Sequence, residues 1–240
     1  MRDYNIYREK IEKFWDINAH VRANDIESGN DKTYVEVISC YIVKRIKKLF
    51  QNPDLSILDI GCGEGYLTNK ISEYYKNITG IDLSKAFISY ACNRYPHIKF
   101  LHEDIYRLSD CEKYDLCLAT MVVHNLPHFS DFFTKTVSLL KEGGYLLLTT
   151  LHPNNWPRER IPNFLYEKND EEYEVPLRGS SDCKYSSSLN YFHRTLEAYL
   201  NPENFQIIKY YELYGYEDDS ENRKRRKEPN ILVILLQSKL

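Results

Sequence analysis

The stretch ILDIGCGEGYLT, residues 57–68, places three glycines within five residues directly after an apolar run. The apolar run predicts a short buried strand at 56–60, and the residues that follow predict a helix at 66–75. Because glycine has no side chain, the backbone N–H groups of Gly61 and Gly63 can come close to a ligand at this turn. The helix N-terminus also favours a carboxylate or a phosphate there. The stretch therefore predicts a ligand-binding turn.

The spacing of the glycines distinguishes between classes of ligand. A dinucleotide-binding turn has the pattern GxGxxG, in which the last glycine lets the helix pack against the strand. Here the pattern is GxGxG, and Tyr66 stands at the next position. This departure argues against a pyrophosphate ligand and against a nucleotide-dependent dehydrogenase, which is one alternative for a chain of this type.

Strand-like and helical patterns alternate around this stretch. We expect strands at 56–60, 78–82, 98–102, 114–120 and 145–151, and helices at 66–75, 85–95 and 129–141, the last capped by glycines 143–144. Short apolar strands that alternate with helices are typical of right-handed βαβ units. The pattern predicts an α/β fold with a doubly wound sheet.

The two ends of the chain complete a single predicted domain, residues 1–240. Residues 1–50 contain two amphipathic helical patterns, at 4–22 and 32–50. A short helix is expected at 191–200, followed by a hairpin of two strands at 205–216 and 230–238. Between these parts, residues 152–190 show little periodicity and contain several aromatic residues. We interpret them as an insertion that lines a substrate pocket, with simple packing onto the sheet as an equal alternative.

Two acidic residues stand where further strands end. Asp82 closes the strand after the glycine turn, and a carboxylate there can accept hydrogen bonds from both hydroxyls of a ribose. Asp104 follows the third strand, where a carboxylate can accept from the amino group of an adenine. A helix cap at Asp82 and a solvated loop acid at Asp104 are the alternatives. One ligand that needs these acceptors and a carboxylate-friendly turn, but no phosphate cradle, is S-adenosylmethionine.

At this point the sequence resembles the class I S-adenosylmethionine-dependent methyltransferases. ILDIGCGEG is similar to their first motif, ITGIDLS to the second, HEDI to the third and YDLCLATMVVHNLP to the fourth, while LLKEGGYLLLTTLHP leads into their fifth strand. The resemblance implies a Rossmann-like three-layer sandwich. Its seven-stranded sheet would be mostly parallel, with one antiparallel strand from the C-terminal hairpin.

The resemblance also implies a set of cofactor-binding residues. Asp59, Gly61 and Gly63 would border the methionine part, Asp82 the ribose, and Leu83, Asp104 and Ile105 the adenine. Thr120 would lie near the methionine amine, and Cys62 belongs to the same turn. FWDINAHVR resembles an N-terminal helix that closes over the cofactor, and the helices of residues 1–50 would form a lid. Trp15 would cover the site, or belong to the core, and Arg22 would reach the methionine carboxylate.

Histidines at strand ends are the candidates for contact with the methyl acceptor. His124 and His193 are candidate catalytic bases, since imidazole titrates near neutrality. His152, Trp156 and His193 are candidate substrate-binding residues, and each histidine could instead be structural. His124 and His128 are four residues apart, but Pro127 intervenes, so no metal site is expected.

Composition and motifs narrow the acceptor. The net charge is −3, and the six cysteines form no CxxC pair, which suits reduced thiols and a cytoplasmic protein. The charged N-terminus predicts no signal peptide, and no apolar run is long enough to predict a membrane span. No NPPY-type tetrad of amino-group nucleic-acid methyltransferases follows the fourth strand. We therefore expect methyl transfer to an N or O atom of a small metabolite or peptide natural product.

Two other functions stay open. The basic run RKRRK, residues 223–227, could bind RNA, although it follows the acidic EDDSE and a solvated loop is the simpler interpretation. A non-catalytic cofactor-binding module would have the same motifs without turnover. The sequence predicts neither the oligomeric state nor the identity of the acceptor.

Overall fold

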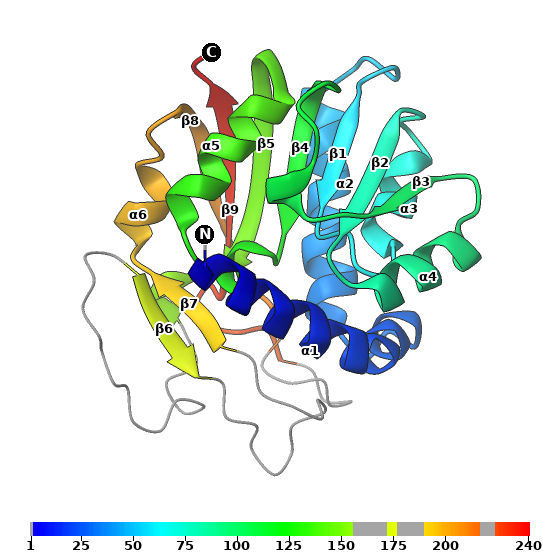
Figure 1. Cartoon of the computed structure of the whole chain (residues 1–240). Helices are drawn as coiled ribbons and strands as arrows, with labels where there is room; N and C mark the ends of the chain where they lie inside the picture. Colours follow the sequence, from blue (N-terminus) through cyan, green and yellow to red (C-terminus); the bar gives the residue numbers. More distant parts are fainter. Residues whose placement is uncertain (1, 156–171, 177–189, 217–223) are drawn as a thin grey trace.

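Seven strands form one mixed sheet in the computed structural model, which describes residues 2–155, 172–176, 190–216 and 224–240 (Figure 1). Their order is β3-β2-β1-β4-β5-β9-β8. The strands are β1 (Ile57–Ile60), β2 (Ile78–Asp82), β3 (Lys99–His102), β4 (Tyr114–Thr120), β5 (Leu140–Leu151), β8 (Phe205–Leu213) and β9 (Ile231–Ser238). Strands β1 to β5 pair in parallel, and β9 pairs antiparallel with both β5 and β8. Within this sheet β9 is therefore the reversed strand, and the predicted seven-stranded fold class is confirmed.

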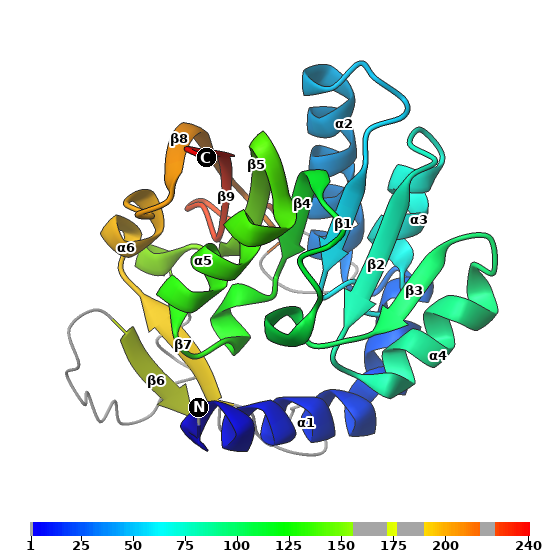
Figure 2. The same cartoon turned by 45° about the horizontal axis from the view of Figure 1, so that its top comes forward.

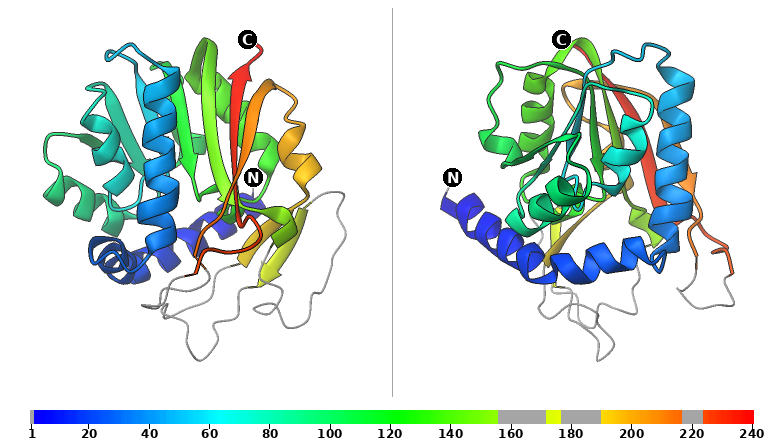
Figure 3. Two further views of the ribbon diagram at one scale, coloured as in Figure 1. Left: turned by 180° about the vertical axis from the view of Figure 1, so that it is seen from behind. Right: turned by 90° about the vertical axis from the view of Figure 1, so that its right-hand side faces the viewer.

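Helices cover both faces of the sheet. The helices are α1 (Arg2–Glu27), the π-helix η1 (Thr33–Ser39), α2 (Cys40–Leu49), α3 (Tyr66–Ser72), α4 (Lys85–Arg94), α5 (Phe129–Leu139) and α6 (Leu196–Leu200). Three short 3-10 turns are η2 (Ile105–Arg107), η3 (Val123–Asn125) and η4 (Pro153–Asn155). One core cluster joins α2, α3 and α4 to the sheet, and another joins α5 and α6 to its opposite face. Figure 3 shows these two layers on either side of the strands.

Helix α1 belongs to neither layer. It crosses the carboxyl ends of the parallel strands, below the sheet in the view of Figure 2. Its buried apolar side chains Ile11 and Phe14 pack with Leu83, the residue after β2, and Trp15 packs against Phe14 and Phe87. The carboxyl edge of a parallel sheet is where ligands of α/β proteins bind. The first helix thus lies over the edge at which a site is expected.

Two predictions of local structure were wrong. The glycines 143–144 do not cap α5, because the backbone becomes extended at Leu140, which pairs with Tyr114. The glycines instead lie inside β5, where the register with β4 shifts and Gly143 has a φ of +66°. Pairing of β5 with β4 therefore outweighs the local preference of these glycines for the end of a helix.

The segment 191–200 is not one helix. Its first part is β7 (Asn190–Arg194), which pairs antiparallel with β6 (Glu172–Pro176), a strand missed in the sequence. Helix α6 begins only after Thr195, whose hydroxyl caps it by accepting from the backbone N–H of Ala198 at 3.2 Å. Most of the predicted insertion, 156–171 and 177–189, lies outside the described residues.

Candidate active site

The glycine turn after β1 has a fixed shape. Gly61, Gly63 and Gly65 all have positive φ, at +68°, +57° and +84°. A Cβ at Gly61 would lie 2.3 Å from Val122 Cγ2, so a side chain is excluded there by space as well as by conformation. At Gly63 a Cβ would meet nothing within 4 Å. The turn therefore exposes its backbone to an open cavity, as the sequence predicted.

Asp82 ties the end of β2 to this turn. One carboxylate oxygen accepts from the backbone N–H of Gly63 at 2.9 Å, and the other accepts from that of Ser84 at 2.8 Å. Burial nevertheless raises the pKa of Asp82 to about 6. The carboxylate lines the cavity together with Gly61 and Gly63 of the glycine turn.

Two more buried acids are close in the sequence to this turn: Asp59 in β1 and Glu64 within the turn itself. Asp59 accepts from the hydroxyl of Thr68 at 2.6 Å, and burial raises its pKa to about 7. Glu64 is 4% exposed, its Oε1 has no hydrogen-bond partner, and burial raises its pKa to about 7 as well. Buried carboxyls with raised pKa values mark functional sites and are stabilised in the ionised form by a nearby cation. The turn is thus suited to a cationic ligand.

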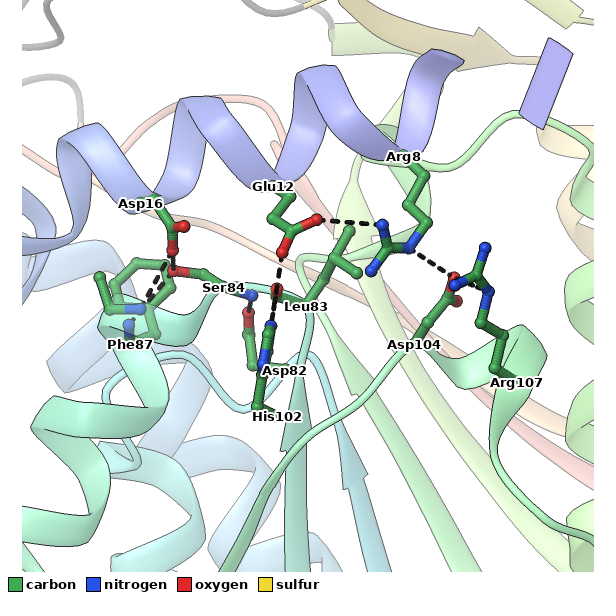
Figure 4. Close-up of polar contacts among 11 residues, drawn as sticks. Arg8, Glu12, Asp16, Asp82, Leu83, Ser84, Phe87, His102, Asp104 and Arg107 are labelled. Carbon is green, nitrogen blue, oxygen red and sulfur yellow. Dashed lines mark hydrogen bonds and ion pairs between the residues drawn. The ribbon is translucent and has the colours of Figure 1, made fainter. Parts of the chain in front are cut away.

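Asp104 lies at the cavity in contact with α1 (Figure 4). Its Oδ1 accepts from the hydroxyl of Tyr4 at 2.7 Å and from the backbone N–H of Tyr106 at 3.0 Å. Its Oδ2 accepts from Arg8 Nε at 3.2 Å. Asp104, the predicted acceptor of the adenine amino group, is therefore hydrogen-bonded to two side chains of α1.

Helix α1 is held to the loops below it by a row of polar contacts. Arg8, Glu12 and Asp16 are spaced four residues apart and share one face of the helix (Figure 4). Arg8 Nη1 lies 3.1 Å from Glu12 Oε2, and Glu12 Oε1 lies 3.5 Å from His102 Nε2. Asp16 accepts from the hydroxyl of Ser84 at 2.7 Å and from the backbone N–H of Ala86 at 3.0 Å. Asp16 thereby caps the N-terminus of α4 from another element.

Uncharged polar groups gather where β4 ends. Thr120 Oγ1 and Asn125 Oδ1 are buried, line the cavity and have no hydrogen-bond partner. His124 lines the cavity between them, and Thr150 Oγ1 lies 3.4 Å from its Nδ1. Burial, and secondarily the charge of Arg194, lowers the pKa of His124 to about 3, so the imidazole is neutral at physiological pH.

Arg194 holds this loop in place. It is 1% exposed, and its guanidinium donates to the carbonyl oxygens of Val123, at 2.8 Å, and Leu126. The same group lies over the ring of Phe129, 4.5 Å from the centroid. These contacts fix η3, the turn that presents His124 and Asn125 to the cavity.

The cavity has a volume of about 430 Å³, within the usual range for a small-molecule site. Nearly all of the predicted cofactor residues line it, namely Trp15, Arg22, Gly61, Cys62, Gly63, Asp82, Leu83, Asp104, Ile105 and Thr120. Asp59 does not line it; its carboxylate accepts from Thr68 and so joins β1 to α3. Arg22, the predicted partner of the methionine carboxylate, forms an ion pair with Asp31.

The predicted substrate residues are less well gathered. Among the described residues, His124 lines the cavity and His152 and His193 do not. His152 Nε2 lies 2.9 Å from Glu212 Oε1, and His193 Nε2 lies 3.0 Å from the carbonyl oxygen of Pro153. Trp156 lies outside the described residues. Groups of acidic, cysteine and histidine side chains able to hold a metal were not found in the described part of the chain.

Several residues at the site were missed in the sequence. Glu64 occupies a variable position of the glycine pattern, so the pattern assigned it no role. Arg194 directly follows His193, and only the histidine was considered as a site residue. Tyr4, Arg8 and Asp16 lie four and eight residues apart on α1, a spacing that is also common on an ordinary solvated helix face. Only Asn125 had a signal, since it follows His124 directly after a strand end.

Comparison with known families supports the site. Residues 58–148 match the family model of the methyltransferase domain. These residues are a class I S-adenosylmethionine-dependent methyltransferase domain. The match runs from β1 to β5 and includes the glycine turn, Asp82, Asp104 and the end of β4. The predicted family and cofactor are thereby confirmed.

This chain has relatives with named activities. It is 36% identical over 155 residues to phthiotriol/phenolphthiotriol dimycocerosates methyltransferase 1 of Mycobacterium ulcerans, covering 60% of this chain and 56% of that protein. It is 25% identical over 153 residues to the ubiquinone biosynthesis O-methyltransferase of Rickettsia bellii, covering 62% and 64%. The chain thus matches between half and two thirds of the length of these relatives.

A solved structure shows the same fold. This chain superposes on an S-adenosylmethionine-dependent methyltransferase of Methanosarcina mazei with a TM-score of 0.63 and 20% identity, over 81% of this chain and 97% of that one. Helices able to span a membrane were not found among the described residues.

The residues present fit S-adenosylmethionine. This molecule has a sulfonium, an ammonium and one carboxylate, so its net charge is positive, and the buried acids of the turn favour a cation. Thr120 Oγ1 and Glu64 Oε1 are buried oxygens without partners, and buried polar atoms are normally paired. Asp82 and Asp104 would hold the ribose and the adenine edge.

Proposed function

We propose that this chain transfers the methyl group of S-adenosylmethionine to an N or O atom of a small metabolite or peptide natural product. One relative is named an O-methyltransferase of ubiquinone biosynthesis, which favours an oxygen acceptor. The cavity lies between α1 and the carboxyl edge of the sheet, and α1 contributes Tyr4, Ile11 and Trp15 to its wall. A covered cavity of this kind favours a small acceptor over a folded macromolecule.

The observation that carries the proposal is the group of uncharged acceptor atoms at the end of β4. Asn125 Oδ1 is buried, unpartnered and beside the glycine turn, and it can accept the hydrogen of an O–H or N–H nucleophile. Thr120 Oγ1 can accept or donate next to it. These atoms would orient a nucleophile that still carries a hydrogen.

S-adenosylmethionine, when bound, supplies a methyl group that is already activated for displacement. The contribution of the protein is therefore alignment, which is one of the largest sources of rate enhancement. In the proposed mechanism Asp82 and Asp104 fix the nucleoside, the glycine turn and its acids hold the methionine end, and Asn125 directs the acceptor.

A role for His124 as a strong general base is not supported by its environment. A base with a pKa of about 3 has little tendency to take a proton from a hydroxyl near neutrality. We propose instead that neutral His124 orients the acceptor by hydrogen bonding. His193, whose Nε2 contacts a backbone carbonyl oxygen away from the cavity wall, is not part of the proposed mechanism.

The test is a turnover screen with matched acceptors. The protein is incubated with S-adenosylmethionine and a panel of phenols, catechols and amines, and S-adenosylhomocysteine release is measured by mass spectrometry. Each active acceptor is repeated as its fully methylated counterpart, which offers no nucleophile. Asn125→Ala should lower kcat by about tenfold or more while cofactor binding is kept. Cofactor binding without turnover on any acceptor of the panel would contradict the proposal and favour a non-catalytic module.

A further inference from the structure

The basic run of residues 223–227 has a feature that methyl transfer does not explain. The structure describes it from Lys224 onward, and Lys224, Arg225 and Lys227 are exposed, as expected for a solvated loop. Arg226 differs, because it is half-buried and lines the same cavity as Asp82 and Thr120. One cation of the loop is thus directed into the site.

Arg226 is held in a defined position. Its backbone N–H donates to the carbonyl oxygen of Gly215 at 3.0 Å, and its Nε donates to that of Tyr216 at 3.2 Å. Tyr216 is anchored in turn to η1: its backbone N–H donates to Thr33 Oγ1 at 3.0 Å, and its hydroxyl donates to Glu36 at 2.7 Å. The guanidinium is therefore preorganised, which lowers the entropy cost of binding a ligand.

No carboxylate of the described residues lies within ion-pair distance of Arg226. The other arginine of the cavity wall, Arg22, is paired with Asp31, and Arg8 of the lid is paired with Asp104. The Nε of Arg226 donates to Tyr216, and among the described residues its two terminal nitrogens form no hydrogen bond, so they can contact a ligand. A guanidinium fork matches a carboxylate or a phosphate in geometry as well as in charge.

The order of the sheet places Arg226 at the end of the cavity opposite the nucleoside. Asp104 and Asp82 follow β3 and β2, whereas Arg226 stands shortly before β9, with Asn230, Ile231 and Leu151 in the same wall. From β1 to β9 there are three strand spacings, about 14 Å at about 4.8 Å each. In the order of the sheet, β1, β4 and β5 separate this end of the cavity from the strand that carries Asp82.

We propose that Arg226 is the specificity-determining residue of the acceptor subsite, and that it selects methyl acceptors carrying a carboxylate or a phosphate group. The inference rests on the proposed function, because it assigns the acceptor to the β5–β9 end of the same cavity. Arg226 would fix the anionic group of the acceptor while Asn125 directs the nucleophilic atom.

The experiment uses the full chain saturated with S-adenosylhomocysteine. Acetate, benzoate and inorganic phosphate are titrated by calorimetry, with acetamide and benzamide as neutral counterparts of the two carboxylates. The anions should bind saturably, and benzoate about tenfold more tightly than benzamide, the scale of one charge-assisted hydrogen bond. Arg226→Gln should abolish this preference, and Arg226→Lys should restore part of it. Lys227→Gln removes the same charge from an exposed neighbour and should leave the preference unchanged.

Three outcomes would overturn the inference. The first is wild-type protein that shows no saturable binding of any anion, and the second is Lys227→Gln that loses the preference as fully as Arg226→Gln. The third is Arg226→Gln that weakens S-adenosylhomocysteine binding by the same factor, since the arginine would then hold the cofactor's own carboxylate. Failure of S-adenosylhomocysteine to bind wild type would defeat the proposed function itself, and the first titration detects it separately.

Discussion

Neutralising Glu64 should change how the stability of the protein depends on pH. This side chain lies in the glycine turn, is 4% exposed, and has one oxygen without a partner. Burial raises its pKa from 4.5 to about 7, which the nearby charge of Arg22 only partly offsets. The folded protein therefore holds a proton that the unfolded chain releases between these two pH values.

The sign and size of the effect follow from this difference. Because the folded state binds more protons, the free energy of unfolding contributed by Glu64 is greatest near pH 4.5 and is lost as the pH rises to about 7. At 1.36 kcal/mol per pH unit, the loss between pH 5 and pH 8 is about 2–3 kcal/mol. Glu64→Gln cannot ionise and should lose none of it. Asp59 and Asp82 act in the same direction, but they are present in both proteins and largely cancel in the comparison.

The assay is urea unfolding of both proteins at pH 5, 6, 7 and 8 without cofactor. The variant should gain about 2–3 kcal/mol relative to wild type across this range. Glu73→Gln is the matched control, since Glu73 is exposed on the neighbouring helix and its removal should leave the pH dependence unchanged. Parallel curves for wild type and Glu64→Gln would refute the reasoning, because the carboxyl would then ionise as freely in the folded protein as in the unfolded chain.

Three further predictions concern the elements around the site. Asp16→Ala should lower the free energy of unfolding by about 1 kcal/mol, because the backbone N–H of Ala86 in the first turn of α4 and the hydroxyl of Ser84 lose their acceptor. Glu9→Ala on the exposed face of α1 is the control, and equal effects of the two substitutions in urea unfolding would contradict this role of Asp16. Arg194→Met should cost about 2–4 kcal/mol in the same assay, because the carbonyl oxygens of Val123 and Leu126 lose their buried donor; a loss below about 1 kcal/mol would mean that η3 needs no such support. His124→Gln should make the free energy of unfolding fall less between pH 7.5 and pH 4.5. The pKa of His124 is lowered from 6.5 to about 3, so wild type loses about 2–3 kcal/mol over this range as the unfolded chain takes up a proton. A constant difference in the free energy of unfolding between the two proteins over that range would contradict the buried neutral imidazole.

The parts of the fold that the sequence predicted best are those with a strong local pattern. The strands from β1 to β4 are short apolar runs bounded by glycine or acidic residues, and their predicted ranges differ from the observed ones by no more than a residue at an end. The C-terminal hairpin was also predicted. The errors lie where strand pairing outweighs local preference. Glycines 143–144 were predicted to cap a helix and lie in β5, and the residues from 191 were predicted to be helical and lie first in β7.

The candidate site divides in the same way. Asp82, Asp104 and the glycines were predictable because a motif fixes their spacing and strand ends gather at one edge of the sheet. Arg194 and Arg226 come from segments far along the chain and reach the site only through folding. Arg194 is buried beneath η3, and Arg226 is held by its hydrogen bonds to the carbonyl oxygens of Gly215 and Tyr216. Their sequence context, a short helical pattern and a charged loop, is shared by many solvated segments.

The most direct test of the account is calorimetric titration of the purified chain with S-adenosylhomocysteine, carried out in parallel on wild type and Asp82→Ala. The account predicts one site per chain with an affinity on the order of micromolar, weakened in the variant by about 1–3 kcal/mol, the cost of an unpaired polar group. Absence of binding to wild type, or an affinity that Asp82→Ala leaves unchanged, would contradict the assignment of this cavity as the cofactor site.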